Sequence, residues 1–247
     1  MSIQRTLLIG LVIALLACIP TYKWIFHYNF DVLPFGWMAA GMSYMAVFFH
    51  EIGHTVFAWF YGYPTIPMFD FQHGGGFAYS FGDAQLAISV CIWAALGYGV
   101  FTLKDHKVLA GGLAALLLFN LATFYSPDLR LSVIDFMGPG LEPIIAGFFL
   151  YRAIFDLAPR GNVERAMNAI VGFGMIFRIF LDAAGLLRNE VHRYMYYNQK
   201  GMHGFGDFDK IASRFQGLNF EIIVYGWVGL TILCLVIPFT LLILYRR

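Results

Sequence analysis

The sequence predicts an all-α polytopic membrane protein with about six to seven transmembrane helices. Its 247 residues are 60% hydrophobic and only 13% charged, whereas soluble domains are about 25% charged. The apolar residues gather in runs long enough to cross a bilayer, which takes about 20 residues of helix. The sequence contains no internal repeat, and no polar stretch is long enough to fold as an independent domain. Residues 1–247 are therefore expected to form one multi-pass integral membrane domain.

Seven apolar segments are expected to supply the helices. They cover about residues 6–22, 36–62, 85–103, 107–125, 138–157, 164–188 and 220–245. The first segment follows Arg5, so a cleaved signal peptide is an alternative to a first transmembrane helix. The tryptophans near segment ends suit an aromatic belt at the membrane interface. These are Trp24, Trp37, Trp59 and Trp227.

The net charge indicates which partners to expect, and the positions of the cysteines indicate whether disulfides are expected. The formal net charge is only +1, and no basic face stands out, which argues against nucleic acid. The expected partners are the lipid bilayer and a substrate within it. Cys18, Cys91 and Cys234 lie inside apolar runs without CxxC spacing, so we expect them to pack rather than to form disulfides.

The second apolar segment carries a HEIGH motif with His50, Glu51 and His54. Residues four apart lie on one face of a helix, so the two histidines project together. Zn²⁺ is held by such imidazoles together with a third ligand, with one position left open for water. Glu51, on the adjacent face, would accept the proton of that water and pass it to a leaving amine.

The setting of the motif favours a functional role. A chance HExxH, or a polar face lining a water-filled cavity, is the alternative. An ionisable group deep in an apolar segment costs several kcal/mol unless it is paired, coordinated or hydrated. The three polar residues lie in such a segment, so a metal site is the preferred interpretation.

The stretch HEIGHTVFAWFYG resembles the site-2 protease group of intramembrane zinc metalloproteases. That resemblance implies a zinc endopeptidase acting on membrane-embedded or membrane-proximal peptide bonds. It also implies an aspartate ligand from a later helix, in a motif of asparagine and prolines followed by Leu-Asp-Gly. The nearest match is Leu181-Asp182-Ala183-Ala184-Gly185, which lacks the proline-rich lead-in. The resemblance therefore gives Zn²⁺ the ligands His50, His54 and Asp182, with Glu51 as the general base.

Two other carboxylates compete with Asp182 for the third position, namely Glu142 in MGPGLEP and Asp135 just before it. Asp182 could instead pair with Arg178, one helical turn earlier. Glu142 could simply favour a helix N-terminus through the helix dipole.

Two polar stretches are expected on the same side as the motif. In FDFQHGGGFAYSF (69–81, with His73), alternating apolar residues suggest a short strand. The resembled family has a membrane-associated hairpin there, whose edge could hold an extended substrate; an interfacial loop is the alternative. In KGMHGFGDFDKIA (200–212), His203 and Asp207 have the spacing of a metal pair, but a helix N-cap at Asp207 or Asp209 is preferred.

Two other function classes remain open. A transporter or an inactive protease-like scaffold would also place charged residues in a span, although neither needs the glutamate of HEIGH. A di-iron membrane oxygenase could use HxxxH, but such sites need about eight histidines. This chain has seven.

Overall fold

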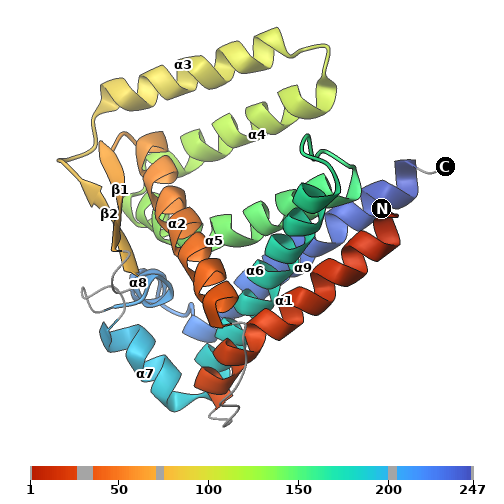
Figure 1. Ribbon diagram of the computed structural model, residues 1–247. Coiled ribbons are helices and arrows are strands. Elements are labelled where there is room, and N and C mark those ends of the chain that lie inside the picture. The colour runs from red at the N-terminus through yellow and green to blue at the C-terminus, as the bar shows by residue number, and fades with distance from the viewer. Residues whose placement is uncertain (1, 27–35, 71–74, 200–204, 246–247) are drawn as a thin grey trace.

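The computed structural model describes residues 2–26, 36–70, 75–199 and 205–245. Within these ranges the chain is helical apart from one hairpin of two strands (Figure 1). The elements are α1 Ile3–Phe26, α2 Gly36–Phe60, β1 Thr65–Asp70, β2 Gly75–Ser80, α3 Leu86–Thr102, α4 Lys107–Phe124, α5 Pro127–Ile154, α6 Asn162–Arg188, α7 Glu190–Gln199, α8 Asp207–Arg214 and α9 Phe220–Tyr245.

Each of the seven predicted apolar segments coincides with a helix, namely α1 to α6 and α9. Within the described residues, four of them, α4, α5, α6 and α9, are long and apolar enough to cross a membrane. Helix α3 is apolar but shorter, as is the stretch Ile3–Cys18 of α1. The structure is thus consistent with the expected all-α class, and four of the six to seven expected spans have the length and composition to cross a membrane. The polar stretch after α6 adds two short helices. A helix continuing through Lys210 was expected where α8 lies, whereas α7 was not predicted.

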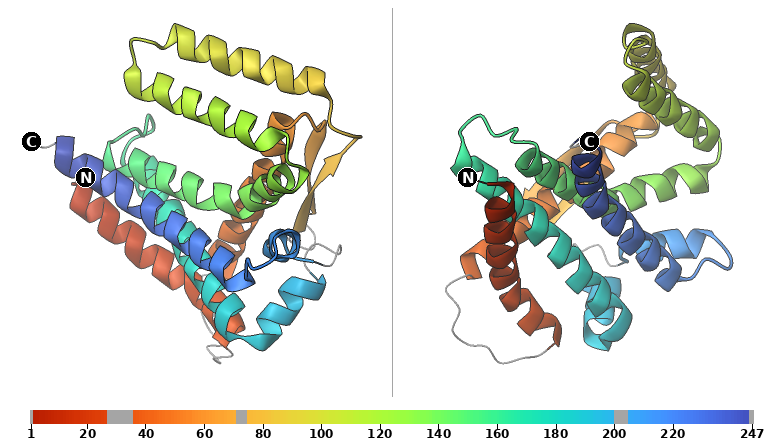
Figure 2. Two further views of the ribbon diagram at one scale, coloured as in Figure 1. Left: turned by 180° about the vertical axis from the view of Figure 1, so that it is seen from behind. Right: turned by 90° about the vertical axis from the view of Figure 1, so that its right-hand side faces the viewer.

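Helix α5 is the centre of the molecule. It packs against α2, α6 and α9, while α1 runs along α6. The hairpin of α3 and α4 stands apart from this bundle in both views of Figure 2. The N-terminal helix belongs to the packed core, because Ala14 is fully buried together with Leu150 of α5 and Ile176 of α6.

A second apolar cluster joins α6 to the last two helices. It is built from Ile179, Ala183, Leu186, Phe208, Ile211, Phe220, Ile223, Val224 and Trp227. Phe208, on α8, is only 1% exposed. Burying such a ring from water contributes a few kcal/mol. This burial fixes α8 against the bundle, although the helix has only eight residues.

Two prolines shape the middle of α5. Pro143 has no N–H, so it cannot donate to the carbonyl four residues earlier, that of Pro139. The indole Nε1 of Trp227 donates to this carbonyl at 2.8 Å. A neighbouring helix thus satisfies the group, as buried membrane helices require. Trp227 is only 3% exposed, so it packs inside the bundle rather than on its outer surface.

The stretch after α2 forms the expected hairpin. Strands β1 and β2 pair antiparallel, with Thr65 opposite Ser80 and Asp70 opposite Gly75. The Thr65 and Ser80 hydroxyls lie 2.8 Å apart, and Trp59 Nε1 of α2 donates to the Thr65 carbonyl at 2.6 Å. These contacts anchor the strands to the end of α2. The predicted loop residue His73 lies outside the described residues.

Candidate metal centre

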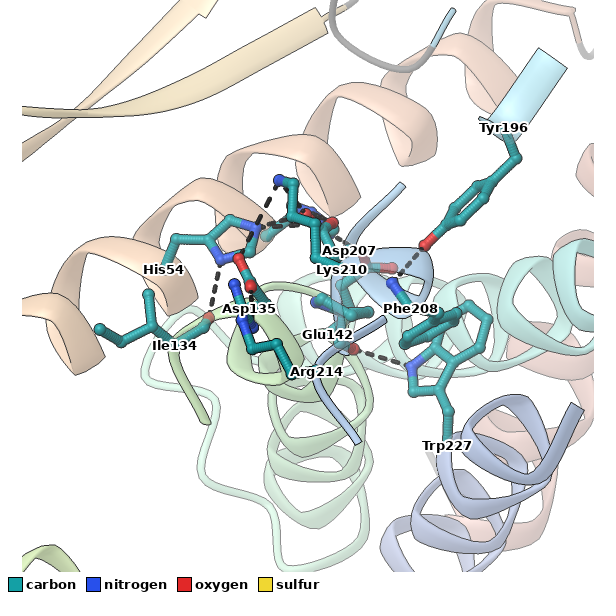
Figure 3. Close-up of polar contacts among 12 residues, drawn as sticks. His54, Ile134, Asp135, Glu142, Tyr196, Asp207, Phe208, Lys210, Arg214 and Trp227 are labelled. Atoms are coloured by element: carbon teal, nitrogen blue, oxygen red, sulfur yellow. Dashed lines mark hydrogen bonds and ion pairs between the residues drawn. The ribbon is translucent and has the colours of Figure 1, made fainter. Parts of the chain in front are cut away.

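Three side chains bring their ligand atoms together between α2 and α8. His50 and His54 lie one turn apart on α2, and Asp207 is the first residue of α8. Asp207 Oδ2 lies 3.1 Å from His50 Nε2 and 3.6 Å from His54 Nε2. The two Nε2 atoms are 3.1 Å apart. The side chains are 11%, 11% and 7% exposed, so the cluster is shielded from solvent. Figure 3 shows His54 and Asp207 facing each other within the network of polar contacts.

Each imidazole is oriented through its other nitrogen. His50 Nδ1 lies 2.8 Å from Glu142 Oε1, and His54 Nδ1 lies 2.8 Å from the Ile134 carbonyl oxygen. A carbonyl or carboxylate oxygen accepts, so each Nδ1 carries the proton in the neutral ring. Both Nε2 atoms then present lone pairs toward each other and toward Asp207. Metal-binding histidines are typically oriented in this way.

The close approach of α2 to α5 depends on two glycines. A Cβ on Gly53 would lie 1.9 Å from the Met137 carbonyl oxygen. A Cβ on Gly138 would lie 2.2 Å from His54 Nε2. Small residues allow membrane helices to approach closely in this way. The GPG sequence of α5 therefore leaves the space in which the His54 ring lies.

Side chains of α7 hold the start of α8 next to Asp207. Phe208 donates its backbone N–H to the Tyr196 hydroxyl at 3.2 Å. Arg193 of α7 holds both carboxylate oxygens of Asp209, with Nη1 to Oδ2 at 3.0 Å. The residue at the N-cap is Gly206, so the predicted N-cap role of Asp207 or Asp209 is wrong. Both aspartates lie inside the first turn, where the helix dipole favours negative charge.

A pocket of about 550 Å³ opens onto the cluster. It is lined by His50, Glu51, His54, Ala58, Thr65, Gly76, Phe77, Ala78, Tyr79, Ser80, Ile134, Asp135, Phe205, Asp207 and Lys210. Glu51 is buried, at 6% exposed. The backbone of β2 lies directly against it, because a Cβ on Gly76 would be 2.6 Å from Glu51 Cγ.

Two cationic side chains of α8 accompany the carboxylates. Lys210 Nζ lies 3.1 Å from Asp207 Oδ1 and 4.0 Å from Asp135 Oδ1. Arg214 Nη1 lies 2.6 Å from Asp135 Oδ2. Four carboxylates (Glu51, Asp135, Glu142 and Asp207) face two cations here. The formal net charge of these six side chains is therefore −2, which one divalent cation would neutralise.

The structure brings some of the predicted site residues together and separates others. Asp182 is not in the group: its Oδ1 lies 3.2 Å from His192 Nε2, and its side chain is 36% exposed. The carboxylate beside the histidines is Asp207, which replaces Asp182 as the candidate third ligand. Glu142 orients His50. Arg178, the suggested partner of Asp182, donates to the Ser43 carbonyl at 3.1 Å.

The sequence indicates Asp207 only as a helix cap or as a metal partner of His203, which lies outside the described residues. A better signal was available. Asp207, Lys210 and Arg214 fall on one face of a short helix whose Phe208 and Ile211 are apolar. Such a polar face in a hydrophobic chain needs polar partners.

No known protein family, curated protein or solved structure matches the chain.

Proposed function

We propose that this chain is a multi-pass membrane zinc metallopeptidase whose metal is held by His50, His54 and Asp207. The observation that carries the proposal is the spacing of the three ligand atoms, at 3.1, 3.1 and 3.6 Å. Ligands about 2.1 Å from a tetrahedral ion lie about 3.4 Å apart. Without a cation, two imidazole lone pairs and a carboxylate would face one another in a buried site, which is unfavourable.

The donor set favours zinc among the common metals. Two imidazole nitrogens and one carboxylate oxygen are a frequent catalytic zinc set, with the fourth position left open. Ca²⁺ and Mg²⁺ prefer six or more oxygen ligands. A di-iron site needs a larger set of ligands than the three that are grouped among the described residues.

A divalent zinc ion in this position would polarise the substrate carbonyl and lower the pKa of water to about 7. Glu51, adjacent to His50 and lining the same pocket, would accept a proton as the water oxygen bonds to the carbonyl carbon. The carbonyl π pair then moves to its oxygen. When that pair returns, the C–N bond breaks and Glu51 gives its proton to the leaving nitrogen. Water and peptide become a carboxylic acid and an amine.

The substrate class follows from the surroundings of the pocket. Strand β2 contributes five consecutive residues to its wall, Gly76 to Ser80, and forms one edge of the hairpin. An extended peptide could align along such an edge. Because the pocket is lined in part by α5, a helix long enough to cross a membrane, the proposed substrates are membrane-embedded or membrane-proximal peptides.

The deciding experiment compares four purified proteins in detergent: wild type, Glu51→Gln, Asp207→Asn and Asp182→Asn. Zinc is measured by mass spectrometry, and cleavage is measured on casein and on a fluorogenic single-span peptide. We expect one zinc per wild-type chain, a zinc-loaded but inactive Glu51→Gln, and a zinc-poor, inactive Asp207→Asn.

Asp182→Asn serves as the matched control, since it removes a carboxylate outside the ligand group; it should keep its zinc. Full zinc in Asp207→Asn would exclude this ligand set. Zinc without cleavage in the wild type would favour a binding scaffold, and two irons per chain would favour an oxygenase.

A further inference from the structure

Lys210 not only forms an ion pair with Asp207 but also lines the pocket. It follows Asp207 by three residues on α8, so both side chains lie on one face of the helix. Its Nζ approaches Asp207 Oδ1 at 3.1 Å, while Oδ2 of the same carboxylate faces the histidines. One carboxylate group therefore separates the ammonium from the candidate metal position.

The hydrogen-bonding capacity of Lys210 is only partly used. An ammonium has three donors, and its partners among the described residues are Asp207 at 3.1 Å and Asp135 at the 4.0 Å limit of an ion pair. Asp135 is closer to Arg214, at 2.6 Å. The Lys210 side chain is 38% exposed, against 20% for Arg214, and it lines the pocket.

We propose that Lys210 is a catalytic residue, which donates a hydrogen bond to the substrate oxygen that becomes negative during hydrolysis. This inference rests on the proposed peptidase function. Apart from the histidines, Lys210 is the only cationic side chain among the described residues that line the pocket. As the carbonyl π pair moves to oxygen, an N–H of Lys210 stabilises the new charge. Lys210 keeps its proton, and Glu51 carries out the proton transfers.

The test compares wild type with Lys210→Met, Lys210→Arg and Lys107→Met. Lys107 lies at the exposed start of α4, so it controls for loss of a lysine elsewhere. In Lys210→Met, with zinc saturating, we expect kcat to fall about 10²- to 10³-fold, as for removal of an oxyanion donor. KM should change little. Lys210→Arg should retain part of the activity because it keeps the charge.

A second measurement separates transition-state stabilisation from a structural role. A peptide phosphonamidate, whose tetrahedral anion imitates the charged oxygen, should bind Lys210→Met more weakly by about the factor lost in kcat/KM. Zinc content should equal that of the wild type. A zinc-loaded Lys210→Met with wild-type kcat overturns the proposal, and so does an activity loss that only follows zinc loss. If the wild type holds zinc but cleaves no peptide, the peptidase function itself fails.

Discussion

Both ring nitrogens of each site histidine have a defined neighbour. His50 lies between Glu142 and Asp207, at 2.8 and 3.1 Å. His54 lies between the Ile134 carbonyl and the other histidine. Such outer partners fix the tautomer and the ring orientation and make the free nitrogen a better ligand. The site is therefore organised by α5 as much as by the motif on α2.

Glu142→Gln should lower zinc affinity by about 10- to 100-fold, the usual effect of losing an outer partner of a ligand histidine. Glutamine can still accept from Nδ1 but lacks the charge that strengthens the bond, so the fold should persist. Zinc affinity is measured by competition with a chelating dye, with Glu221→Gln, an exposed position at the start of α9, as control. An unchanged affinity would contradict the role given to Glu142. Metal loss as complete as in His50→Ala would instead make Glu142 a ligand.

The sequence predicted the local pair of the site, and it also named Glu142 and Asp135 as candidates, but it did not predict which carboxylate lies beside the histidines. His50 and His54 share one helix, so their spacing alone predicted that they meet. Asp207 meets His50 across 157 positions of the chain, and no spacing rule covers that distance. The sequence around Asp182 is similar to the aspartate motif of the resembled family. In the structure, however, Asp182 lies near the end of α6 and its carboxylate contacts His192.

Among the elements, the hairpin has the closest contact with the proposed general base. Strand β2 crosses Glu51 at Gly76, where a methyl group would lie 2.6 Å from Glu51 Cγ and 3.2 Å from Cδ. Gly75 precedes it on the same strand, and a Cβ there meets nothing within 4 Å. The two glycines therefore form a matched pair, of which only one restricts Glu51.

Gly76→Ala should reduce peptide cleavage by about 10- to 100-fold, since misplacing a catalytic group by about 1 Å has effects of that size. The methyl group must displace the Glu51 side chain, and its three nearest atoms are two of Glu51 and the Met68 carbonyl oxygen at 3.1 Å, none of them from the histidines or Asp207. Zinc content should therefore stay at the wild-type level. Gly75→Ala should cleave like the wild type. Equal activities in the two variants would show that the contact with β2 does not position Glu51.

The sequence predicted long elements better than short ones. The helices follow from apolar runs of about 20 residues, and a strand follows from alternation at residues 77–81, while the hairpin itself was implied by the family resemblance. Helices α7 and α8 are short and contain no long apolar run, and their order comes from tertiary contacts such as Phe208 with Trp227. Propensity and hydropathy do not contain such contacts.

On the scale of the whole molecule, the candidate centre connects parts of the chain that are far apart in sequence. Its ligands come from α2 and α8, and the partners that orient the histidines come from α5. Hydropathy predicted most of the bundle, but not which helices would be neighbours. It also gave no sign that the hairpin of α3 and α4 would stand apart from the bundle.

Because one ion would join α2 to α8, metal removal should destabilise the whole protein. Binding of an ion at 1,000 times its dissociation constant stabilises the folded state by about 4 kcal/mol. Without it, a formal charge of −2 and facing lone pairs remain in a buried site. We expect 1,10-phenanthroline to lower the midpoint of thermal unfolding, followed by tryptophan fluorescence in detergent. Amide hydrogen exchange should rise first in residues 207–214, since α8 is short and loses one of its anchors.

Two controls make this outcome specific to the metal. The isomer 1,7-phenanthroline resembles the chelator in size and aromaticity but does not chelate, so it should leave the midpoint unchanged. Asp207→Ala should start at a lower midpoint than the wild type and respond little to 1,10-phenanthroline, because the ion that the chelator would remove is already weakly held. If the chelator lowers both midpoints equally, it acts elsewhere in the molecule, and α2 and α8 are held together by packing alone.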